Sequence, residues 1–189
     1  MFNYSKYNIN NDNVNYGRID YCPILDHTAQ ILRPFATAGN KSEYQKYINR
    51  YGYHNGVDLV PYNDNATLSE SDYIVPAYSP AMGIVLSVSD YTIPETGSTG
   101  AIKSVVIQYD AETSFRVGNL TETFVTPGQT VTQYDLIGNA KKWVHFEMLT
   151  YAREYNTSVM FTFNKLKLFI ANPMNYFTGN YSGLNEGVG

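Results

Sequence analysis

A series of short apolar runs, each ended by residues that favour turns, constrains this chain more than any other feature. The runs are rich in Val, Ile, Tyr and Phe, which are typical of strands, and the segments between them are rich in Gly, Pro, Asn and Thr. The expected strand regions are 73–89, 101–109, 115–125, 143–151 and 159–170. The expected turns are 94–100, 126–129 and 138–139. Many short strands joined by such turns predict a mostly β domain built on antiparallel sheet.

Length and texture predict one domain with extensions. The 189 residues, 43% of them hydrophobic, suffice for one sizeable core. We expect residues 1–40 to form an Asn/Tyr-rich N-terminal extension, residues 41–180 the folded domain, and residues 181–189 a C-terminal tail. Within the domain, residues 42–51 have the spacing of a short helix, with Ser42 as its N-cap.

Composition excludes several classes of function. A net charge of −4 gives no electrostatic reason to bind nucleic acid or an anionic membrane. Cys22 is the only cysteine, so neither an internal disulfide nor a sulfur-rich metal cage can form. No apolar stretch approaches the roughly 20 residues that span a bilayer, and residues 1–17 do not have the pattern of a secretion signal. We therefore expect no transmembrane segment and no standard secretion.

The three histidines of the chain bear directly on its chemistry. His54 lies four residues before Asp58, and His145 lies in Trp143-Val144-His145-Phe146-Glu147. Zinc takes nitrogen and oxygen ligands, and hydrolytic sites commonly use three protein ligands. On a strand, period-two alternation puts Trp143, His145 and Glu147 on one face. A His and an Asp at this spacing are common in proteins, so the alternative is that both histidines are satisfied polar groups without a metal.

An ordered series of further matches resembles the lysostaphin/LytM-type zinc endopeptidases, which cut peptidoglycan cross-links. The segment 54–61 is similar to the first metal motif of that family, and 145–147 is similar to the end of its last motif. Further matching segments follow the family's order: 75–85, 104–109, 116–120, 126–138 and 172–177. The resemblance implies a lysostaphin-like fold of the duplicated hybrid motif type. It also implies one Zn²⁺ ion per chain, with His54, Asp58 and His145 as its ligands.

The departures from the family fall at the positions that handle protons. The last motif of the family is His-X-His, in which the second histidine binds zinc and the first is implicated in catalysis. Here the second is His145, but the first is Trp143, and the family's other catalytic histidine falls at or beside Asn119. His27 precedes the whole matching region. The resemblance therefore implies metal ligands but no catalytic histidine.

This loss favours a pseudoenzyme. General acid–base help is typically worth about 10²–10⁴-fold, so a chain without it should be slow at best. Glu147 is either a substitute base or a hydrogen-bond partner of a metal ligand. Trp143 is either a core aromatic that fills a vacated cleft or a surface on which substrate stacks. Whether the chain is an enzyme stays open, with the balance against it.

Three functions follow from the resemblance and the composition. The first is a non-catalytic or weakly catalytic component of a phage tail that binds peptidoglycan or other tail proteins, which would place the chain in the virion. The alternative is an active zinc metalloendopeptidase that cuts peptidoglycan cross-links during phage entry. The third is an assembly module anchored by its N-terminal arm, an arrangement compatible with a homo-oligomer or a larger assembly.

Overall fold

The computed structural model describes residues 29–33, 53–54, 56–61, 74–91, 102–110, 113–150, 160–161 and 170–171. These residues contain no helix, and hence none that could cross a membrane. Their strands are β1 (Ala29–Arg33), β2 (Tyr53–His54), β3 (Val57–Pro61), β4 (Ile74–Tyr78), β5 (Gly83–Tyr91), β6 (Ile102–Gln108), β7 (Thr113–Thr123), β8 (Thr130–Val131), β9 (Leu136–Thr150), β10 (Met160–Phe161) and β11 (Ile170–Ala171). The expected helix over 42–51 and the expected turn over 94–100 lie outside the described residues.

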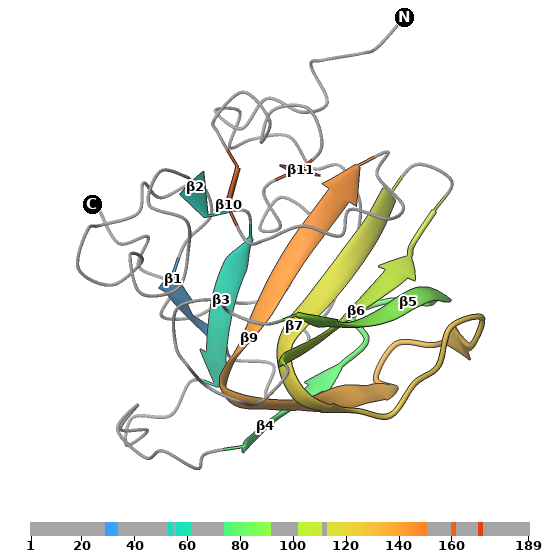
Figure 1. The fold of residues 1–189 in the computed structure, drawn as a ribbon, viewed down its shortest axis with the longest axis horizontal. Coiled ribbons are helices and arrows are strands. Elements are labelled where there is room, and N and C mark those ends of the chain that lie inside the picture. Colours follow the sequence, from blue (N-terminus) through green and yellow to red (C-terminus); the bar gives the residue numbers. More distant parts are fainter. Residues whose placement is uncertain are drawn as a thin grey trace, which may run out of the picture.

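One antiparallel sheet dominates the fold. Its strand order is β1-β3-β9-β7-β6-β5-β8, and β4 and β11 also pair with β9 (Figure 1). A separate two-stranded ladder joins β2 and β10. The expected antiparallel, mostly β fold is therefore confirmed. Strand β1 falls within the expected N-terminal extension, and it pairs with β3 at one edge of the sheet.

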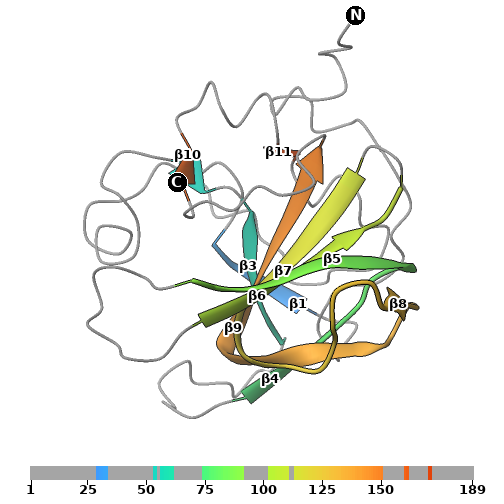
Figure 2. The ribbon, with the colours of Figure 1, turned by 45° about the vertical axis from the view of Figure 1, so that its right-hand side comes forward.

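Strand β9 organises the sheet because it has different partners along its length. Its later part pairs with β3 at Val144 and His145, while its first part pairs with β4 between Leu136 and Lys141. Strand β7 runs beside both parts. Both β7 and β9 bend sharply (Figures 1 and 2). The part of β9 that pairs with β4 therefore turns away from the part that pairs with β3. This bend wraps the sheet around its core.

The core follows from alternation along the strands. Val144 and Phe146 of β9 point into it, and the rings of Phe115 and Phe146 stack with centroids 5.8 Å apart. The alternate residues of the strand, His145 and Glu147, lie on the opposite face, as period-two alternation predicts. The buried apolar residues of this core are Val57, Leu59, Val75, Ala77, Val85, Val105, Ile107, Phe115, Val117, Leu120, Val125, Val131, Ile137, Ala140, Val144, Phe146 and Met148.

The expected turn at 138–139 is wrong. Gly138 and Asn139 lie inside β9, which begins at Leu136 rather than near residue 143. A Cβ on Gly138 would collide with the backbone oxygen of Glu122. The glycine is there because β7 and β9 approach closely, which a local pattern cannot distinguish from a turn. The turn at 126–129 is confirmed, with Gly128 at a φ of 86°.

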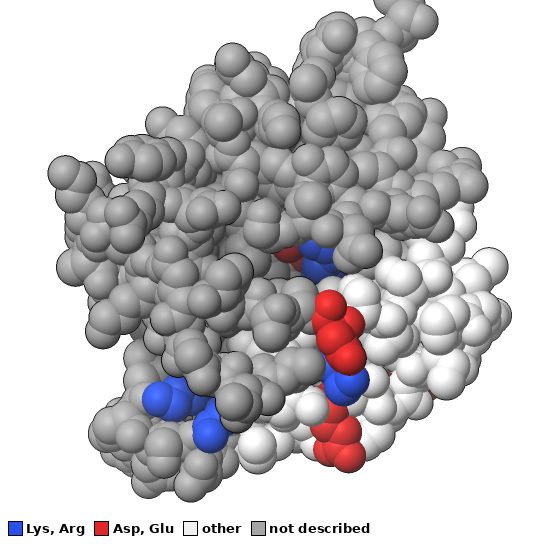
Figure 3. Space-filling model, in the orientation of Figure 1, with Lys and Arg blue, Asp and Glu red and all other residues white. Residues whose placement is uncertain are grey.

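Charged side chains of both signs lie side by side on the face shown in Figure 3, where the described residues form no patch of one sign. One exposed pair joins Lys103 Nζ to Asp90 Oδ1 at 2.6 Å. Such mixed charge on this face does not favour binding of a polyanion.

Candidate functional site

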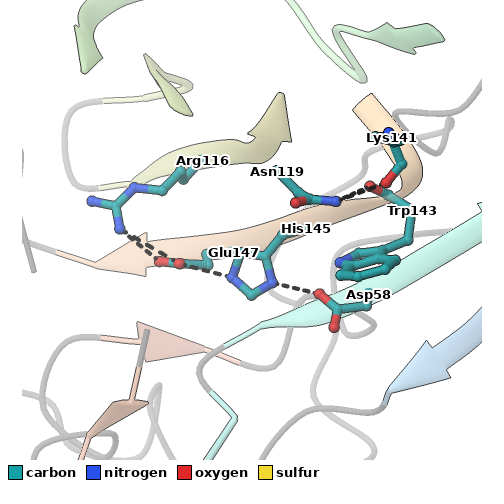
Figure 4. Close-up of polar contacts among 7 residues, drawn as sticks. All are labelled: Asp58, Arg116, Asn119, Lys141, Trp143, His145 and Glu147. Carbon is teal, nitrogen blue, oxygen red and sulfur yellow. Dashed lines mark hydrogen bonds and ion pairs between the residues drawn. The ribbon is translucent and has the colours of Figure 1, made fainter. Parts of the chain in front are cut away.

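Three neighbouring strands bring the polar side chains of the site together. In the register of the sheet, Asp58 of β3 lies opposite His145 of β9, and Arg116 of β7 lies opposite Glu147 of β9. Cross-strand neighbours share one face, so these four side chains form a row on the face away from the core (Figure 4). We call this row the polar row. Asp58 and His145 are 87 positions apart in the chain, and Arg116 and Glu147 are 31 apart.

His145 lies at the centre of the polar row, between two carboxylates. Its Nδ1 is 2.7 Å from Asp58 Oδ1, and its Nε2 is 2.9 Å from Glu147 Oε1 (Figure 4). All three residues are buried, with exposed fractions of 4% for Asp58, 6% for His145 and 2% for Glu147. The hydrogen bond between Glu147 and His145 is therefore present, while the role of His145 as a metal ligand stays a prediction.

The two carboxylates set the charge of His145. Burial lowers the pKa of the imidazole, but the hydrogen bonds to Asp58 and Glu147 and the charges of both carboxylates outweigh it, and the pKa rises from 6.5 to about 9. In the metal-free protein the ring is therefore a cation at neutral pH, and both nitrogens donate to carboxylate oxygens.

Arg116 completes the polar row beyond Glu147. Its Nη1 lies 3.4 Å from Glu147 Oε1 and 3.3 Å from Oε2. The residue Arg116 is only 9% exposed. The row thus alternates in sign from Asp58 to His145, Glu147 and Arg116. Buried charges are tolerated when they are paired and hydrogen-bonded, and alternation pairs each group with its neighbour.

Gly56 allows the close approach of β3 to β9. A Cβ at this position would collide with the backbone oxygen of Phe146 and would come within 3.0 Å of His145 Cε1 and of Glu147 Cγ. The missing side chain of Gly56 therefore makes room for the site.

The side chain of Asn119 hydrogen-bonds to backbone carbonyls of β9. Its side-chain Nδ2 donates to the oxygen of Trp143 at 2.7 Å and to that of Lys141 at 3.2 Å (Figure 4). Asn119 has a φ of 60° and Lys142 a φ of 73°, so β7 and β9 are both irregular here. Asparagine tolerates this left-handed backbone better than most residues.

Trp143 lies on the same face of β9 as His145 (Figure 4), as the alternation predicts, two residues before the position that pairs with Asp58 of β3. The side chain is half-buried. It therefore occupies space next to the candidate ligand pair, at the position where the resembling family has a histidine.

The structure brings together two of the three expected zinc ligands. Asp58 and His145 contact each other directly. The backbone of His54 pairs with Met160 in the β2–β10 ladder, while its side chain, like His27, lies outside the described residues. Among the described side chains, no group of three His, Cys, Asp or Glu residues is arranged to hold a metal. The complete ligand set stays a prediction.

The donors that are described fit zinc in kind and in spacing. An imidazole nitrogen and a carboxylate oxygen are ordinary zinc ligands. Bonds of about 2.0–2.1 Å in a tetrahedron put two ligand atoms about 3.3 Å apart. Nδ1 of His145 and Oδ1 of Asp58 are 2.7 Å apart, so a modest opening of this pair would admit the ion.

Sequence reasoning missed Arg116 as part of the site. The available signal was a lone cation between Phe115 and Val117 in an apolar run. Such a residue on a central strand needs a buried partner, but the sequence does not say which one.

Comparison with solved structures identifies the fold. A chain of the SpoIIQ–SpoIIIAH pore-forming complex matches with a TM-score of 0.55 and 16% identity, over 84% of this chain and 92% of that one. Lysostaphin in solution matches with a TM-score of 0.53 and 12% identity, over 89% of this chain and 60% of that one. Csd3 of Helicobacter pylori matches with a TM-score of 0.50 and 15% identity, over 87% of this chain and 34% of that one. No family model and no curated protein sequence matches the chain.

Proposed function

We propose that this chain, which has a lysostaphin-like fold, is a zinc-binding, non-catalytic or weakly catalytic domain of the peptidase type. It would serve as a cell-wall-binding or structural component of a phage tail. The observation that carries the proposal is the buried contact between Asp58 and His145, on adjacent strands, at the positions of two metal ligands in the resembling family.

His54, Asp58 and His145 would hold the metal. When bound, zinc lowers the pKa of a coordinated water and polarises a carbonyl oxygen. The chain's own contribution is to bury the ligands and to orient His145 between Asp58 and Glu147. These features support metal binding whether or not a substrate is cut.

Three features of the site argue against efficient hydrolysis. Asn119 donates its amide to two backbone carbonyls and is not a proton carrier. Trp143 has no titratable group, and its large ring lies on the face of β9 that carries His145 (Figure 4). Glu147 contacts both His145 and Arg116, so both of its carboxylate oxygens are already engaged within the polar row. We therefore propose Glu147 as a partner of the metal ligand rather than as a substitute base.

The structural role rests on different support. Residues 8–15 are Asn-rich and polar, a composition typical of arms that order against a partner. A chain of similar fold is part of the SpoIIQ–SpoIIIAH complex, so this fold type is compatible with a role in assembly. Peptidoglycan and neighbouring tail proteins are the partners that we propose.

The test measures zinc content, cell-wall binding and cell-wall cleavage on one preparation. We expect about one zinc per chain, loss of zinc in Asp58→Asn and His145→Ala, and retention in the matched histidine control His27→Ala. We expect co-sedimentation with purified Gram-positive cell walls without release of free amino groups.

Cleavage would replace this proposal by the active-enzyme alternative. Release of amino groups that depends on zinc and disappears in Asp58→Asn would establish an endopeptidase. Absence of zinc under saturating conditions would exclude the metal site. In the zinc-loaded protein, the double variant Trp143→His with Asn119→His should raise amino-group release above that of the parent if the groove is otherwise intact.

A further inference from the structure

Arg116 is a buried cation that the proposed metal site does not itself require. It lies on β7, in the central part of the sheet, between the core residues Phe115 and Val117. Its guanidinium points to the polar face, where Nη1 is within 3.4 Å of both carboxylate oxygens of Glu147. A guanidinium is costly to bury, so its placement beside this carboxylate indicates a specific task for the pair.

Glu147 contacts one nitrogen of His145 and so favours a proton on that nitrogen. Its Oε1 is 2.9 Å from Nε2, on the side of the ring away from Asp58. Asp58 Oδ1 is 2.7 Å from Nδ1. A neutral imidazole has one N–H and one lone pair. A carboxylate held at Nε2 accepts the N–H there and leaves the lone pair on Nδ1, facing Asp58.

We propose that Arg116 is a positioning residue of the metal site, which holds Glu147 so that it fixes the proton of His145 on Nε2 and presents Nδ1 to the metal. This inference rests on the proposed zinc site, and it adds a residue that acts from β7, one strand beyond the ligands. The contact runs through Nη1 of Arg116, which reaches both oxygens of Glu147. A carboxylate held at two oxygens cannot rotate away from Nε2 without breaking the ion pair.

The charge balance favours this arrangement. Without Arg116, the buried Glu147 and Asp58 would place two negative charges on either side of one imidazole. The guanidinium lies against both oxygens of the distal carboxylate and so holds Glu147 at Nε2, on the side of the ring away from Asp58. Removal of such outer partners typically costs about 10–100-fold in metal affinity.

The experiment measures zinc affinity by competition with a chromophoric chelator, and the ¹⁵N chemical shifts of the His145 ring in the zinc-loaded protein. We expect zinc on Nδ1 and a proton on Nε2 in the parent. Arg116→Met, which keeps a long apolar stem, should weaken zinc binding by about 10–100-fold. Arg116→Lys keeps the charge and should recover part of that loss. Lys103→Met removes a cation from an exposed ion pair on the same sheet and should leave the affinity unchanged.

The outcomes separate this inference from the proposed function. A parent that binds no zinc overturns both. If the parent binds zinc and Arg116→Met binds it with equal affinity, the role of Arg116 is overturned and the zinc site stands. The same holds if the parent carries zinc on Nε2. If Arg116→Met does not fold, Glu147→Gln takes its place, because its amide oxygen can still accept from Nε2 but has no charge for Arg116 to hold. Glu147→Gln alone should weaken zinc binding, and adding Arg116→Lys to it should cause no further loss of zinc affinity. An unchanged zinc affinity in Glu147→Gln overturns the inference.

Discussion

At the scale of single residues, the site depends on what is absent as much as on what is present. Gly56 contributes no side chain, and that absence lets β3 approach the backbone of Phe146 and the ring of His145. Asp58 and His145 can then meet at 2.7 Å. The contact between the two candidate ligands is therefore sensitive to a single added methyl group.

Gly56→Ala should destabilise the protein and weaken zinc binding together. The new Cβ would collide with the backbone oxygen of Phe146, and overpacking of this kind typically costs about 1–3 kcal/mol. Gly128→Ala is the matched control, because its Cβ would meet nothing within 4 Å but its φ of 86° disfavours alanine. It should cost about 1 kcal/mol without changing zinc affinity. Urea unfolding and chelator competition measure the two effects, and equal zinc losses in both variants would contradict the argument.

At the scale of elements, the pairing of β7 with β9 determines where the site lies. The register shifts between Gly118 and Leu120, and Asn119 adopts a φ of 60° at the shift. Its amide donates to the carbonyls on either side of Lys142. Bulges of this kind bend strands, and this one lies between the part of β9 that pairs with β4 and the part that carries His145. Asn119 therefore supports the bend of the sheet, at or beside the position where the resembling family has a catalytic histidine.

Asn119→Ala should lower the free energy of unfolding by about 1–3 kcal/mol, because two hydrogen bonds are lost and alanine adopts a left-handed backbone less favourably than asparagine. Thr121→Val is a control on the same strand, since it removes one exposed bond from Thr121 Oγ1 to the oxygen of Asn139. That change should stay within about 0.5 kcal/mol. Urea denaturation measures the free energy of unfolding of both variants. If Asn119→Ala loses no more stability than Thr121→Val, contacts other than those of Asn119 hold the bend.

At the scale of the whole molecule, one core connects every strand that supplies the site. Phe146 of β9 is fully buried and stacks on Phe115 of β7, while the same two strands carry His145 and Arg116 on their other face. Side chains on the two faces of a strand share one backbone. Packing in the core therefore determines how closely the members of the polar row approach one another.

Phe146→Ala should reduce stability by about 3–5 kcal/mol, the usual cost of deleting a buried aromatic ring, and should weaken zinc binding as β9 relaxes. Phe124→Ala removes the same ring from a side chain that is 46% exposed, so it should cost much less and leave zinc affinity intact. Chemical unfolding monitored by tryptophan fluorescence gives the stability, with Trp143 as the single tryptophan of the chain. Similar losses in the two variants would show that β9 is not held by this core.

Local patterns in the sequence were enough to predict the antiparallel fold class, the turn at 126–129 and the face of β9 that carries His145 and Glu147. Alternation and turn residues act over a few positions, so they can be read without knowledge of the partners. They were insufficient at 138–139, where the glycine serves a close approach between strands. The domain limits, the side chain of His54 and the place in a phage tail remain predictions.

The resemblance indicated which residues to examine, but only the tertiary structure decided how they meet. Asp58, His145 and Arg116 come together through the register of β3, β9 and β7, and register depends on packing between segments far apart in the chain. For the same reason no local pattern could assign Glu147 to Nε2 of His145 or tie Asn119 to the carbonyls of β9. The sequence by itself determined the chemistry that is available, and the folded sheet determined which groups can act on one another.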